Sequence, residues 1–166
     1  MQSRITSVIQ APRARLVLRV LGAILLLFVG ADHYYEYSVD EYSVLPTIGT
    51  LFLLNFISAT VIGVILLAPL DRVFHRFGRI TLQLASLSGF GIAATSLVAL
   101  LVSEQTKLFG FMESNYRPAI IVALASEAAA AAILMLLFIA SWGGRRPASP
   151  AKAPLGDHSQ PSASTL

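Results

Sequence analysis

Four long apolar stretches constrain the fold of this chain more than any other feature. They cover residues 16–33, 48–70, 80–102 and 119–142. A bilayer core about 30 Å thick is crossed by roughly 20 mostly apolar residues in a helix, which bonds every backbone amide internally. Only 13% of the 166 residues are charged, about half the average of soluble domains. We therefore predict an all-α membrane protein, a bundle of four transmembrane helices.

The basic residues predict the direction of the spans, because Lys and Arg are retained in cytoplasmic loops. All but two of the twelve lie in or beside the N-terminal segment, in the loop between the second and third spans, or in the C-terminal tail. Lys107 and Arg117 are the exceptions. Both termini are therefore expected in the cytoplasm. The residues expected to set this topology are Arg13, Arg15, Arg72, Arg76, Arg79, Arg145 and Arg146.

The spans divide the chain into a cytoplasmic segment (1–15), a transmembrane domain (16–142) and a cytoplasmic tail (143–166). The tail is rich in Pro, Ser, Gly and Ala, a composition that predicts disorder. The first span has a second interpretation as a secretory signal peptide, because Val29-Gly30-Ala31 fits a cleavage site after an apolar core. Arg19 within that span and the long leading stretch favour an uncleaved helix.

Small residues predict how the helices pack. In lipid the hydrophobic effect does not drive helices together, so their association depends on close packing, which small residues allow. The second span has Ala59 and Gly63, and the fourth has the alanine run 128–132. The third has Ala85, Gly89 and Ala93. We expect these faces to pack within the chain first, and a homo-oligomer interface is the alternative.

Polar side chains are expected to gather in the outer half of the bundle. Asn55 and Glu127 both lie about 10–12 Å below the outer surface if each residue advances about 1.5 Å. The hydroxyls of the third span reach a comparable depth, and the end of the first span lies above them. The predicted cluster consists of His33, Glu36, Asn55, Thr95, Ser96 and Glu127.

Glu127 is the most informative member of this cluster, because a carboxylate inside a span costs about 2.5–3.5 kcal/mol on insertion scales. It should therefore face the inside of the bundle. We expect a neutral Glu127 that joins helices by a hydrogen bond to Asn55 or to a hydroxyl of the third span. The alternative is a role in carrying a proton or binding a ligand.

His33 and Glu36 are three residues apart and share a face if the first helix extends that far. This spacing resembles the carboxylate–histidine pairs of metal sites in helix bundles. A metal would need further ligands, from Asp32, Asp40 or Glu127. The chain has no cysteine, which excludes thiolate metal sites, iron–sulfur clusters and covalent c-type haem. We expect no cofactor.

The segment between the first two spans carries Tyr34, Tyr35, Tyr37 and Tyr42, which predict an interfacial aromatic belt, with stacking against a ligand as the alternative. His33, this tyrosine-containing loop and the following Leu45-Pro46-Thr47-Ile48-Gly49-Thr50-Leu51-Phe52-Leu53-Leu54 resemble a group of uncharacterised small four-helix membrane proteins of high-GC Gram-positive bacteria. The resemblance covers roughly residues 20–70, and members often have glutamine where this chain has Asn55. It implies the fold and a bacterial plasma-membrane location, and no activity.

No phosphate-binding glycine loop, nucleophile elbow or zinc-protease motif occurs in the sequence. We therefore expect a non-catalytic structural or accessory component, in contact with the lipid bilayer and with a partner membrane protein or a second copy. Nucleic acid is not an expected partner, because the basic residues flank the spans. A second hypothesis is a small oligomeric transporter or proton-linked permease that uses Glu127 and Asn55. A third is a redox protein that binds haem, metal or quinone near His33.

Overall fold

The computed structural model describes residues 11–69, 77–110, 112 and 118–142. Its four long helices are α2 (Pro12–Ser38), α3 (Pro46–Leu67), α5 (Gly78–Ser103) and α6 (Pro118–Trp142), and a short 3-10 helix, η1 (Tyr42–Val44), precedes α3. All four are long and apolar enough to cross a membrane. They are the helices of a multi-pass membrane protein.

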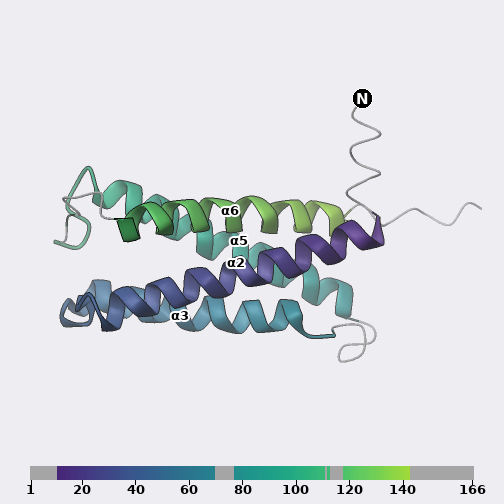
Figure 1. The fold of residues 1–166 in the computed structure, drawn as a ribbon, viewed down its shortest axis with the longest axis horizontal. Helices are drawn as coiled ribbons and strands as arrows, with labels where there is room; N and C mark the ends of the chain where they lie inside the picture. Colours follow the sequence, from purple (N-terminus) through teal and green to yellow (C-terminus); the bar gives the residue numbers. More distant parts are fainter. Residues whose placement is uncertain (1–10, 70–76, 111, 113–117, 143–166) are drawn as a thin grey trace, which may run out of the picture.

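The four helices form a bundle in which successive helices run in opposite directions (Figure 1). α2 packs against α3 and α6, and α5 packs closely against α6 and more loosely against α3. The order around the bundle is therefore α2, α3, α5, α6. The end of α2, the start of α3 and η1 lie at one end of the bundle, which we call the η1 end (Figure 1).

Three of the long helices begin with proline: Pro12, Pro46 and Pro118. The first helical position suits proline, because its missing N–H would have no partner there and its φ is already helical. α3, α5 and α6 differ from the predicted spans by at most three residues at either end. α2 instead continues past His33 to Ser38, so part of the predicted loop is helical.

Small residues bring the helices together, as predicted for the second and third spans. Ala59, Gly63, Ala85, Gly89 and Ala93 are all buried. A Cβ atom on Gly63 would lie 2.8 Å from two carbon atoms of Leu27, so α2 and α3 approach too closely for a larger residue. In α6 only part of the alanine run is buried, namely Ala130 and Ala131, whereas Ala128 and Ala132 are exposed.

Two arginines close the ends of neighbouring helices at the end opposite η1. Arg19 of α2 donates from Nε to the Leu66 carbonyl and from a terminal nitrogen to the Ala68 carbonyl, and each donor–acceptor distance is 2.6 Å. Arg79 of α5 donates to the carbonyls of Ser141 and Trp142 at 2.9 and 3.1 Å. The last carbonyls of a helix lack intrahelical partners and carry partial negative charge, so a guanidinium suits both positions.

The residues expected to set the topology are partly visible. Arg13 and Arg15 lie in the first turn of α2 and Arg79 in the first turn of α5, at the same end of the bundle (Figure 1). Arg72, Arg76, Arg145 and Arg146, and the segments 1–10 and 143–166, lie outside the described residues.

Candidate functional site

A cavity of about 540 Å³ lies in the half of the bundle nearest η1. Most of its wall comes from α3 and α5, the loosely packed neighbours, and α2, α6, η1 and Leu108 complete it. Exposed residues of both helices contribute to this wall: Leu51 and Leu54 of α3, and Ser88 and Thr95 of α5. The cavity is therefore open between α3 and α5, on a face that the acyl chains of a bilayer would surround.

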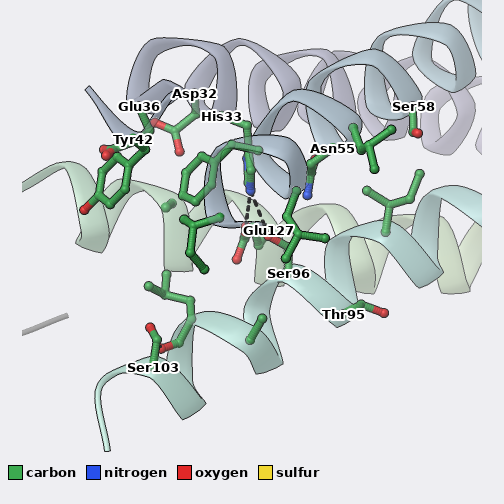
Figure 2. Close-up of a pocket in the computed structure, with 18 of the residues that line it drawn as sticks. Asp32, His33, Glu36, Tyr42, Asn55, Ser58, Thr95, Ser96, Ser103 and Glu127 are labelled. Atoms are coloured by element: carbon green, nitrogen blue, oxygen red, sulfur yellow. Dashed lines mark hydrogen bonds and ion pairs between the residues drawn. The ribbon is translucent and has the colours of Figure 1, made fainter. Parts of the chain in front are cut away.

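Three side chains from three helices meet in the wall of this cavity (Figure 2). The Oγ atom of Ser96 on α5 lies 2.6 Å from Oε1 of Glu127 on α6 and 2.9 Å from Nε2 of His33 on α2. His33 Nε2 lies 3.6 Å from the same Glu127 oxygen. We call His33, Ser96 and Glu127 the triad.

Hydrogen-bond chemistry determines how many protons the triad holds. His33 Nδ1 lies 2.9 Å from the Val29 carbonyl, which can only accept, so Nδ1 carries a hydrogen. Ser96 has one hydrogen to donate, so a neutral His33 and an ionised Glu127 would compete for it. With one further proton, both contacts of Ser96 are satisfied.

That proton has two possible positions. If it is on His33, Nε2 donates to Ser96 and Ser96 donates to the ionised Glu127. If it is on Glu127, the carboxyl donates to Ser96 and Ser96 donates to the neutral His33. The net charge of the triad is the same in both states, an ion pair in the first and two neutral groups in the second, so the proton can move between α2 and α6 through Ser96 without changing the net charge of the bundle.

Two oxygens in the cavity wall are left without a hydrogen-bond partner. They are Oε2 of Glu127, whose side chain is almost fully buried, and Oδ1 of Asn55 on α3. Buried polar atoms in folded proteins are usually hydrogen-bonded, and a group that is not calls for an explanation. Each belongs to a residue that lines the cavity, so the wall contains two acceptors that the described residues leave unbonded.

All six residues of the predicted polar cluster line the cavity, but their contacts differ. Of the two partners expected for Glu127, the hydroxyl of the third span is the one that bonds it, through Ser96. Asn55 does not bond Glu127, and Thr95 is an exposed residue of the cavity wall. Glu36 shares a buried face of α2 with His33, because α2 extends beyond both.

The aromatic wall of the cavity was missed by the sequence analysis. Tyr42 of η1 is buried and stacks on Phe52 of α3, with ring centroids 5.1 Å apart and an interplanar angle of 5°. Tyr42 is therefore packed within the end of the bundle, whereas Tyr34 and Tyr35 are exposed, as a position in an interfacial belt requires. No local pattern could reveal this pair, because it depends on η1 folding back over α3.

The cavity wall is acidic. Asp32, Glu36 and Glu127 contribute three carboxyl groups, and no Lys or Arg is among the described residues that line it. In the described part of the chain, no group of three or more His, Asp or Glu is placed to hold a metal ion.

Comparison with known proteins adds no further constraint. No protein-family model matches this chain, and no curated protein or solved structure matches it either. Membership of the high-GC Gram-positive group therefore stays a prediction from the sequence.

Proposed function

We propose that this protein binds a small amphipathic molecule in the cavity between α3 and α5, with the polar end of the molecule at the triad. Binding of this kind is the step that a proton-linked permease requires, and it gives Glu127 a role beyond joining helices. The observation that carries the proposal is the unpartnered Oε2 of Glu127 in the wall of an open cavity.

The shape and chemistry of the cavity support this proposal. Small-molecule sites are concave and mostly apolar, with a few convergent polar groups that orient the ligand. Here apolar residues of α3 and α5, such as Leu51, Leu54 and Ile92, surround one polar wall formed by the triad and Asn55. A molecule with an apolar body and one polar end would enter from the lipid between α3 and α5 and satisfy both sets of contacts.

A purely structural role explains this arrangement less well. A carboxyl group retained only to join α5 and α6 would be expected to have both oxygens hydrogen-bonded, since an unpartnered buried acceptor costs about 1–3 kcal/mol. Ser96 and His33 contact only Oε1. A donor group of a ligand at Oε2 would supply the hydrogen bond that Ser96 and His33 do not make to this oxygen.

Calorimetric titration of 1-naphthylmethanol into the protein in lipid nanodiscs tests the proposal. This probe combines an apolar body with a single hydroxyl, and empty nanodiscs measure its partition into lipid. We expect saturable binding above that partition. Heats that match those of empty nanodiscs at every concentration would overturn the proposal.

Gly91 offers a matched pair of variants for the same experiment. It lines the cavity on α5, and a Cβ atom added to it would meet no atom within 4 Å. Gly91→Ala should bind the probe as the unaltered protein does, whereas Gly91→Phe should fill the cavity and abolish binding. Equal saturable binding by both variants would place the probe elsewhere on the protein and would count against the cavity.

A further inference from the structure

We infer that the ligand of this cavity is a small amphipathic amine, bound as its ammonium ion, and that it displaces the proton of the triad. This inference rests on the proposed function, because it names the class of molecule that the cavity binds. Three features of the wall lead to it: the kind of polar atoms left unpartnered, the charge of the wall and the proton that the triad holds.

The unpartnered atoms require a donor. Glu127 Oε2 is an acceptor in both one-proton states of the triad, because the proton sits either on His33 or on the other carboxyl oxygen. Asn55 Oδ1 is an acceptor as well. A ligand whose polar end only accepts hydrogen bonds, such as an aldehyde, would satisfy neither atom, whereas an ammonium group has several N–H donors.

The charge of the wall selects a cation among possible donors. The titratable groups that line the cavity together with Glu127 are Asp32, His33 and Glu36 on α2 and Tyr42 on η1, while the polar residues that α3 and α5 contribute are neutral. No basic side chain among the described residues of the wall would repel a cation or compete with it for Glu127.

The triad can release its additional proton when this cation binds. When an ammonium ion donates to both oxygens of the ionised Glu127, Oε1 no longer needs the Ser96 hydrogen, so Ser96 donates to neutral His33 and the additional proton of the triad is not required. That proton leaves to water as the ammonium ion binds, so the charge of the occupied site equals that of the empty one. No covalent bond of the ligand forms or breaks, and binding exchanges one cation for another.

A matched series of naphthalene probes tests the inference on the unaltered protein in lipid nanodiscs. The series consists of 1-naphthylmethylamine, 1-naphthylmethanol, 1-naphthaldehyde and 1-naphthoate, which share one apolar body. We expect the amine to bind about tenfold more tightly than the alcohol, because hydrogen bonds between charged groups are about twice as strong as neutral ones. The aldehyde and the naphthoate should bind more weakly than the alcohol.

Titration in two buffers of different ionisation enthalpy measures the proton. The amine should release close to one proton for each molecule bound, and the alcohol should release none. Equal affinities of amine and alcohol would refute the inference while leaving cavity binding intact. Binding of none of the four probes would overturn the proposed function as well.

The Glu127→Gln variant tests whether the released proton comes from the triad, because glutamine keeps the shape of the side chain and has no proton to release. In this variant the preference for the amine and the proton release at Glu127 should both disappear, while the alcohol still binds. Glu36→Gln makes the same change of charge elsewhere on the cavity wall, so it should weaken binding of the amine but keep the proton release. Proton release that persists in Glu127→Gln would show that the amine itself loses the proton, and would refute the exchange. If Glu127→Gln does not fold, the comparison of amine with alcohol on the unaltered protein still decides.

Discussion

Ser96 and Glu127 stand 31 positions apart in the sequence, yet Oγ of the first lies 2.6 Å from Oε1 of the second. The same Oγ atom reaches His33 Nε2 at 2.9 Å, so a single hydroxyl connects α2, α5 and α6. Its position explains how a carboxyl group is accommodated deep in an apolar bundle. Because the hydroxyl bonds two other helices, removing it should change the free energy of unfolding.

Ser96→Ala should destabilise the protein by about 1–3 kcal/mol, because it leaves a buried carboxyl and a buried imidazole without their shared partner. Equilibrium unfolding in mixed micelles measures the change. Ser88→Ala is the control, since Ser88 lies on the same helix and lines the same cavity but is exposed. The same small change in both variants would mean that the triad contributes nothing to stability.

Arg19→Ala should lower the free energy of unfolding by about 1–3 kcal/mol, because the carbonyls of Leu66 and Ala68 lose their charged donor. Arg19→Lys should restore only part of this loss, since an ammonium group cannot reproduce the fork of a guanidinium. Arg13→Ala removes the same charge from an exposed position of the same helix and should have little effect. Equal losses in Arg13→Ala and Arg19→Ala would show that charge, and not the contact with α3, is responsible.

Gly49→Ala should destabilise the η1 end by about 1–3 kcal/mol, which is typical of overpacking. A Cβ atom there would lie 2.6 Å from the Tyr42 carbonyl oxygen and 3.0 Å from Ser43 Cα, and backbone atoms cannot rotate away. Gly91→Ala adds the same methyl group to open space and should leave stability unchanged or raise it by up to about 1 kcal/mol. Thermal unfolding of both variants in one detergent provides the comparison, and a harmless Gly49→Ala would contradict the close contact between η1 and α3.

The predicted cytoplasmic location of both termini can be tested with single cysteines, because the chain has none of its own. Thr106→Cys, between α5 and α6, should react with a membrane-impermeant maleimide added to sealed cells. Phe77→Cys, just before α5, should react only after the membrane is opened. The reverse pattern would show that the arginine-bearing end of the bundle faces outward.

Much of the fold was predictable because hydropathy and helix length are local properties of the chain. The four apolar stretches correspond to the four long helices, and the small residues of the second and third spans are buried as expected. The inward position of Glu127 followed from the high cost of a carboxylate in lipid. The helical extension to Ser38 was missed, because its polar residues suggested a loop.

Which residues contact one another within the site could be learned only from the tertiary structure. Asn55, Thr95 and Ser96 were equivalent candidates by depth, yet only Ser96 meets Glu127. The rotation of each helix about its axis decides this, and it is set by the close approach of small residues such as Gly63 and Gly89 to leucines on other helices. Hydropathy tells which segments lie in the membrane, but it carries no information on which face of one helix meets which face of another. The triad and the cavity beside it therefore exist only once the bundle has packed.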